Sequence, residues 1–192
     1  MSKLLSDLGI IPQLQLALAD LEISIATDIQ EQVIPIILNK TEDIVALAKT
    51  GTGKTAAFGL PLLQMVDLKN ENIQTVILSP TRELSQQIYN NFLGFSKHLP
   101  GVSIVLLTGG SPIKSQIEEL KSITHIVVAT PGRFLDLLEK NALDIKSLKN
   151  LVLDEADEMF QALKEDLLPI LKAMPKNRRT LLFSATMPGE LK

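Results

Sequence analysis

A glycine-rich segment at residues 48–55, with the sequence AKTGTGKT, has the residue types needed to bind phosphate. It follows a short apolar run and opens a helical stretch, which is the context that a phosphate-binding loop requires. Gly51 and Gly53 let the backbone curl so that successive N–H groups point at one anion, and the start of a helix adds a partial positive charge. Lys54 would supply a full charge to the β- and γ-phosphates of a nucleotide, and the Thr55 hydroxyl would ligate Mg²⁺. The alternative, a simple glycine-rich turn, does not explain why Gly-Lys-Thr stands at the first turn of a helix.

Two carboxylates, Asp154 and Glu155, directly follow the apolar run at residues 151–153. Carboxylates at the end of a buried strand are costly unless a positive charge lies beside them. A Mg²⁺ ion bound with ATP would supply that charge, with Asp154 as its ligand and Glu155 as the base that orients and deprotonates the attacking water. Acids at the start of a helix are also common, so this segment alone leaves both interpretations open. Together with the phosphate loop, it favours an ATPase.

The elements that would position these residues alternate between strand and helix. Nearly continuous apolar runs, rich in β-branched residues, predict strands at residues 44–47, 76–78, 104–107, 126–128, 151–153 and 181–183. Helical stretches are predicted between them at residues 54–67, 83–98, 112–120, 132–139 and 157–173. This alternation predicts an α/β fold of three layers, a central mostly parallel sheet with helices on both faces. In such sheets the chemistry gathers beyond the carboxyl ends of the strands.

The first 40 residues are predicted to be helical, with one helix opening at Pro12 and a second after Thr27. We therefore divide the chain into an N-terminal helical segment, residues 1–40, and an ATP-binding domain, residues 41–192.

Composition narrows the class of protein less than the motifs do. The net charge of −3 argues mildly against a general nucleic-acid binder, but a few placed arginines and backbone N–H groups can still hold phosphates. The absence of cysteine excludes disulfides and thiolate metal sites, and His98 and His125 form no metal-binding pattern. No apolar run is long enough to span a bilayer, and the N-terminus lacks the core of a secretory signal. We therefore predict a cytoplasmic protein with no membrane partner.

The chain strongly resembles the first RecA-like domain of the DEAD-box RNA helicases over essentially its whole length. The family's motifs occur in order, most of them at the ends of successive predicted strands. After the phosphate loop they are PTREL at 80–84, GG at 109–110, TPGR at 130–133, DEAD at 154–157 and SAT at 184–186, and TDIQ at 27–30 precedes it. Such an ordered set is far more specific than any single motif. The resemblance implies a RecA-like P-loop fold, ATP and Mg²⁺ as cofactors, and RNA as a partner.

The resemblance also implies a role for each matching residue. The nucleotide contacts would come from Gln30, which selects adenine, and from Thr50, Gly51, Thr52, Gly53, Lys54 and Thr55. The catalytic residues would be Lys54, Asp154 and Glu155, and the Mg²⁺ ligands Thr55 and Asp154. The RNA sugar-phosphate contacts would be Thr81, Arg82, Gly110, Thr130, Gly132 and Arg133. The residues coupling ATP state to RNA grip would be Asp157, Ser184 and Thr186. Taken singly, Arg82 and Arg133 would be solvated surface charges, and Ser184 and Thr186 an ordinary polar strand end.

The adenine-binding region departs from the family pattern. Glu22 and Ile23 stand where the family usually has Gly-Phe, and Leu5 stands where an aromatic residue is usual. Aliphatic side chains hold a base less strongly than aromatic rings do. We therefore predict that Gln30 still selects adenine but that nucleotide affinity is lowered.

The family needs a second RecA-like domain, whose arginines stabilise the transferring phosphoryl group, and the sequence stops at Lys192 before one. We expect the isolated chain to have almost no ATPase or unwinding activity. The leading hypothesis is a motor that strips short RNA duplexes and is reset by hydrolysis. The alternative is an ATP-gated RNA clamp with little turnover, which the intact Glu155 disfavours. The RNA motifs argue against a third possibility, a DNA-translocating or metabolic ATPase.

Overall fold

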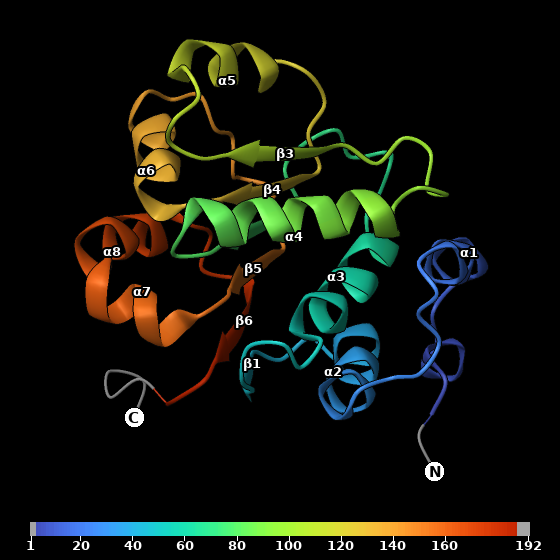
Figure 1. The fold of residues 1–192 in the computed structure, drawn as a ribbon. Coiled ribbons are helices and arrows are strands. Elements are labelled where there is room, and N and C mark those ends of the chain that lie inside the picture. Colours follow the sequence, from blue (N-terminus) through green and yellow to red (C-terminus); the bar gives the residue numbers. More distant parts are fainter. Residues whose placement is uncertain (1–2, 188–192) are drawn as a thin grey trace.

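The computed structural model describes residues 3–187, which form a six-stranded sheet flanked by helices (Figure 1). The strands are β1 (Ile44–Leu47), β2 (Thr75–Leu78), β3 (Ile104–Leu107), β4 (Ile126–Ala129), β5 (Asn150–Leu153) and β6 (Arg179–Ser184). Their order across the sheet is β1-β6-β5-β2-β4-β3, and every neighbouring pair is parallel. The predicted three-layer α/β fold is confirmed, and the sheet is all-parallel rather than mostly parallel.

The helices lie close to their predicted positions, with ends that move by a few residues. They are η1 (Leu5–Leu8), α1 (Pro12–Asp20), α2 (Asp28–Asn39), α3 (Lys54–Gln64), α4 (Arg82–Phe95), α5 (Ile113–Glu119), α6 (Pro131–Glu139), α7 (Ala156–Ala162) and α8 (Lys164–Ala173). The single helix predicted over residues 157–173 is wrong. Leu163 leaves the helical conformation, with φ −126° and ψ 21°, and separates α7 from α8. Its side chain packs on the core, so the apolar pattern continues across the break and does not reveal it.

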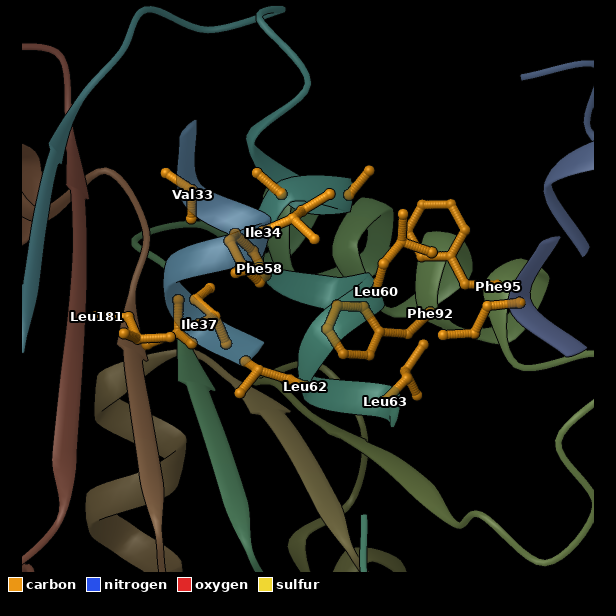
Figure 2. Packing of buried hydrophobic residues seen from close by; sticks show 14 of the residues in the cluster. Val33, Ile34, Ile37, Phe58, Leu60, Leu62, Leu63, Phe92, Phe95 and Leu181 are labelled. Carbon is orange, nitrogen blue, oxygen red and sulfur yellow. The ribbon is translucent and has the colours of Figure 1, made fainter. Parts of the chain in front are cut away.

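Two hydrophobic cores cover the two faces of the sheet, and the strands contribute alternate residues to each. In β2, Ile77 belongs to the core under α2, α3 and α4, whereas Val76 and Leu78 belong to the core under α6 and α8. This two-sided burial explains the nearly continuous apolar runs in the sequence. Figure 2 shows the first core, in which Phe58 of α3 lies among side chains from neighbouring elements. The centroid of its ring is 5.1 Å from that of Phe183 in β6.

The N-terminal helices pack on the same core as α2 and α3. Leu5 and Leu8 of η1 and Leu14 and Leu18 of α1 are all buried there. Leu5 is only 1% exposed. The N-terminal segment therefore packs against the sheet domain within one hydrophobic core. None of the helices within residues 3–187 is long and apolar enough to cross a membrane.

Candidate functional site

The predicted nucleotide-binding segments meet because their strands are neighbours. The phosphate loop follows β1, the acidic segment follows β5, and Ser184 ends β6, which lies between β1 and β5. All three strands run in the same direction, so their carboxyl ends lie at one edge of the sheet. Side chains separated by more than a hundred residues are thereby placed within hydrogen-bonding distance, as for Lys54 and Glu155.

The phosphate loop has the backbone shape and the free donors that an anion requires. Gly51 and Gly53 have φ of +82° and +85°, the left-handed region that favours glycine. Within residues 3–187, no hydrogen bond engages the backbone N–H groups of Gly51, Thr52, Gly53, Lys54 or Thr55. Helix α3 begins at Lys54 without a side-chain cap. The loop therefore presents unpaired donors at a helix N-terminus, which suits a phosphate group.

Lys54 joins the phosphate loop to the acidic segment. Its amine is 2.6 Å from the Glu155 carboxylate and 3.4 Å from that of Asp154, and its side chain is only 6% exposed. The Thr50 hydroxyl donates a hydrogen bond of 3.3 Å to the same carboxylate oxygen of Glu155. Glu155 has φ +51° and ψ +51°, a conformation that is strained for a residue with a side chain. The hydrogen bonds from Lys54 and Thr50 hold this carboxylate at the loop.

Asp154 is buried at the end of β5, and burial raises the pKa of its carboxyl, although the Lys54 amine opposes the rise. A buried carboxylate of this kind gains from a further cation. Magnesium in nucleotide sites usually takes one or two protein oxygens and completes its shell with phosphates and water. The Asp154 carboxylate and the Thr55 hydroxyl fit that donor set. Within the described part of the chain, no group of three or more histidine or acidic side chains offers an all-protein metal site.

Gln30 connects the start of α2 to the phosphate loop. Its side-chain oxygen accepts from the Thr27 backbone N–H at 3.0 Å, and its amide nitrogen donates to the Gly53 carbonyl at 3.1 Å. A Cβ on Gly53 would lie 2.5 Å from that nitrogen. Glycine at this position is therefore needed for its backbone conformation and for the close approach of Gln30. The predicted adenine-selecting residue is thus held by two hydrogen bonds and is buried, at 4% exposure.

The three predicted coupling residues form one hydrogen-bonded group. The Thr186 hydroxyl and backbone N–H donate to the Asp157 carboxylate at 2.8 and 3.1 Å. The Ser184 hydroxyl accepts from the Asp157 backbone N–H at 3.2 Å and donates to the Thr186 carbonyl at 2.6 Å. Burial alone would raise the pKa of Asp157, but the hydrogen bonds from Thr186 and from the Glu158 N–H, together with the nearby Ser184 hydroxyl, outweigh it and hold the pKa below its usual value.

The predicted RNA contacts follow β2, β3 and β4, the other half of the same sheet edge. Thr81 caps α4 by accepting from the Leu84 N–H at 3.2 Å, and the Arg82 guanidinium lies against Gly109 and Gly110. A Cβ on either glycine would be 2.9 Å from an Arg82 nitrogen. The loop after β3 is therefore packed on Arg82.

The same loop is also held from the other side. Arg133 donates to the Ser111 carbonyl at 2.9 Å and to the Gln116 side chain at 2.7 Å. Thr130 precedes α6 as its N-terminal flanking residue. Gly132 is not brought to this loop: a Cβ there would lie 3.4 Å from an Asp166 oxygen of α8. The structure thus gathers Arg82, Gly110 and Arg133 and leaves Gly132 against α8.

Residues 27–192 match the family model described as DEAD/DEAH box helicase. The chain belongs to this family. A curated relative, the ATP-dependent RNA helicase CshA of Limosilactobacillus reuteri, is 46% identical over 190 residues, which cover 97% of this chain and 37% of that protein. The ATP-dependent RNA helicase DeaD of Escherichia coli K12 is 44% identical over 188 residues, 97% of this chain and 30% of that protein. The chain thus spans about a third of the length of these relatives.

Solved structures of DEAD-box proteins have the same fold. The DEAD box protein from the hyperthermophile Methanococcus jannaschii is similar with a TM-score of 0.92 and 40% identity, over all of this chain and 52% of that one. Dbp5 of S. cerevisiae, in a structure bound to RNA and ADP BeF3, gives a TM-score of 0.89 and 30% identity, over 99% of this chain and 48% of that one.

Beside the phosphate loop, this DEAD-box domain has a cleft of about 480 Å³, lined by Ile23 of the predicted adenine-binding region and by residues for which the sequence motifs implied no role. Leu21 and Ile23 line it, and so do side chains of α4: Leu84, Gln87, Asn91 and Phe95. Residues 84, 87 and 91 are three and four positions apart, so they lie on one face of the helix. This spacing is the sequence pattern that could have indicated that they line a common site. Leu5, the position where the family usually has an aromatic residue, is buried and does not line this cleft. Ile23 does line it.

Proposed function

We propose that this chain is the ATP-binding half of an RNA helicase that couples ATP binding and hydrolysis to RNA binding and local duplex unwinding. The single observation that carries the proposal is the contact of the Lys54 amine with Glu155 and Asp154 beside a loop of unpaired N–H groups. These are the groups that phosphoryl transfer needs, gathered at one sheet edge. The names of the curated relatives, and the RNA and ADP BeF3 bound by Dbp5, support it.

In this proposal the nucleotide takes the place that Glu155 occupies on Lys54. The N–H groups of residues 51–55 and the Lys54 amine hold the phosphates, and Gln30 selects adenine. Asp154 and Thr55 would hold Mg²⁺, which would neutralise charge on the phosphates. Glu155, released from Lys54, orients the attacking water and accepts its proton.

RNA is proposed to bind along its sugar-phosphate backbone at the other half of the sheet edge. Its contacts would be Thr81, Arg82, Gly110, Thr130, Gly132 and Arg133. Contacts to phosphate carry no base information, so binding is expected to be independent of sequence. The Asp157–Ser184–Thr186 group follows β5 and β6, and β5 is the strand that pairs with β2, the first strand of the RNA half. We assign it the coupling of nucleotide state to RNA grip.

Turnover is proposed to need a second RecA-like domain that closes on ATP and RNA. The greater length of the curated relatives supports this requirement. The 192-residue chain alone is then expected to bind nucleotide weakly and to hydrolyse almost none. A cytoplasmic location stays a prediction from the sequence.

The test is ATP hydrolysis by the full-length protein that carries this domain, with and without single-stranded RNA. RNA should raise the rate, and Glu155→Gln should abolish the increase. Glu158→Gln is the matched control, because Glu158 is exposed on α7 and its carboxylate makes no contact with Lys54. Tight ATP-dependent RNA binding without turnover would support the clamp instead. An RNA-independent rate that survives Glu155→Gln would overturn both.

A further inference from the structure

A second cleft, of about 310 Å³, lies at the opposite edge of the sheet from the phosphate loop. Three of its lining residues, Thr75, Asn150 and Arg179, are the first residues of β2, β5 and β6. These strands are neighbours and parallel, so the cleft opens where their amino ends meet. The proposed nucleotide and RNA contacts all lie at the carboxyl ends, so this cleft has no part in the function proposed above.

The charged groups that line this cleft are all basic. Lys40 and Lys149 are exposed at its rim and Arg179 is buried, at 7% exposure, while no aspartate or glutamate lines it. Glu42 and Asp43 favour the charge of Arg179 from a distance, but within residues 3–187 no carboxylate lies within 4.0 Å of its guanidinium. A buried cation without a close counter-ion favours an anion beside it.

Hydrogen-bond donors also remain available there. Arg179 donates to the carbonyls of Glu42, Ile37 and Ile36 at 2.7, 2.9 and 3.3 Å, and so closes the C-terminal end of α2. A guanidinium has five N–H groups, so these three bonds leave two without an acceptor in the described chain. Asn150 is 6% exposed, and its side-chain amide makes no hydrogen bond within residues 3–187.

One part of the cleft wall is apolar. Leu62, Met65 and Val66 come from α3 and the residues after it, and Leu148 precedes β5. A site of this size, with an apolar wall and a few converging polar groups, has the make-up of a small-molecule site rather than of an ion site alone. A bare inorganic anion would leave the apolar wall uncovered.

We propose that this cleft binds a small organic anion, a carboxylate, phosphate or sulfonate attached to an apolar ring or chain. The anionic group lies between Arg179, Lys149 and the Asn150 amide. The apolar body packs against Val66 and Leu148. The proposal needs neither ATP nor RNA, so it stands or falls independently of the helicase assignment.

The experiment is a titration of the ¹⁵N-labelled 192-residue chain with naphthalene-1-sulfonate, followed by amide chemical shifts. The largest shifts are expected at Lys149, Asn150 and Arg179. Lys149→Glu should weaken binding about ten-fold, because it reverses a charge at the rim. Lys172→Glu, which makes the same change of net charge on α8 outside the cleft, should leave the affinity within about two-fold. The uncharged analogue 1-naphthalenemethanol should bind about ten-fold more weakly than the sulfonate.

Three results would overturn the proposal. They are shifts confined to residues 51–55, equal affinities for the Lys149→Glu and Lys172→Glu variants, and equal affinities for the charged and uncharged probes. Thermal unfolding of each variant checks that the fold is retained, and Met65→Ala provides a second variant at the rim. That truncation removes apolar contact without changing charge and should weaken both probes by the same factor.

Discussion

The amine of Lys54 and the carboxylate of Glu155 lie 2.6 Å apart, although the two residues are on different elements and are joined only through the fold. In this contact the Lys54 amine, which would hold a phosphate of the nucleotide, is paired with a carboxylate. A nucleotide entering the loop must therefore compete with Glu155 for Lys54, and the carboxylate that it displaces is the proposed catalytic base.

This competition predicts that Glu155→Gln tightens ADP binding while removing turnover. The neutral amide holds Lys54 less strongly, so the phosphate meets less opposition, and the dissociation constant should fall about three- to ten-fold. Calorimetric titration of the 192-residue chain with ADP measures it. Glu158→Gln, elsewhere in the same acidic segment, should leave the constant unchanged. Weaker binding by the Glu155 variant would contradict the competition.

The contact between Gln30 and Gly53 predicts unequal effects of two loop substitutions. Gly51→Ala and Gly53→Ala both place a side chain at positive φ, at a shared cost of about 1–2 kcal/mol. Only at Gly53 would the new Cβ collide with Gln30, whereas nothing lies within 4 Å of a Cβ at Gly51. Gly53→Ala should therefore lower the free energy of unfolding by about 1 kcal/mol more, through the lost hydrogen bond. Urea denaturation measures the difference. Equal losses in the free energy of unfolding would show that the Gln30 side chain can move away from the new Cβ at no cost.

The hydrogen bonds to Asp157 predict a pH-dependent effect of Thr186→Val. The folded-state pKa of Asp157 is lowered, so its contribution to stability is present above the unfolded value of about 3.8 and is lost as pH falls through the folded pKa. The variant should be about 1 kcal/mol less stable than the wild type at pH 7, and the gap should close at low pH. Thr180→Val serves as the control, because that hydroxyl makes no hydrogen bond within residues 3–187. A gap that persists unchanged at pH 3 would mean that the carboxylate is not the partner that matters.

The burial of His125 predicts a second dependence of stability on pH, which arises from a group that the fold keeps neutral. Its Nδ1 accepts from the Ser103 N–H at 3.0 Å, and its buried Nε2 has no partner among the described residues. Burial lowers the pKa of His125, so the fold favours the neutral ring. The unfolded chain takes up the proton below about pH 6.5, and stability should therefore fall as pH drops from 7 to 5.

His125→Asn should flatten the dependence on pH between 7 and 5, while His98→Gln, at the chain's other histidine, should retain it. Urea denaturation at pH 7, 6 and 5 compares the three proteins. An unchanged slope in the His125 variant would assign the dependence to other groups.

The architecture could be predicted because burial on both faces leaves short, nearly continuous apolar runs, and these alternate with helical stretches along the chain. The apolar pattern did not predict polar strand starts. β6 begins at Arg179, two residues before its apolar run. The Arg179 side chain donates three hydrogen bonds to carbonyls in and just after α2, which no local pattern reveals. The break in the helix at Leu163 could not be predicted either, because its side chain is apolar and packs on the core, so the apolar pattern continues across it.

The site could be predicted as a set of residues but not as a geometry. The motifs named the residues, and the strand order placed them at one edge. The contact of Lys54 with Glu155 and the left-handed backbone of Glu155 depend on tertiary structure alone. The burial of Leu5 likewise follows from the packing of η1 on α2, which the sequence motifs do not reveal.

The most direct test of the central claim is calorimetric titration of the 192-residue chain with Mg²⁺ and either ADP or GDP, with Lys54→Ala as the control. If the phosphate loop and Gln30 form an adenine nucleotide site, ADP should bind at one site per chain. GDP should then bind at least about ten-fold more weakly, since the pairing of Gln30 with the base edge is lost. Lys54→Ala should show no measurable binding while keeping its fold. Equal affinities for ADP and GDP, or binding that survives the loss of Lys54, would contradict the assignment of this edge of the sheet as the nucleotide site.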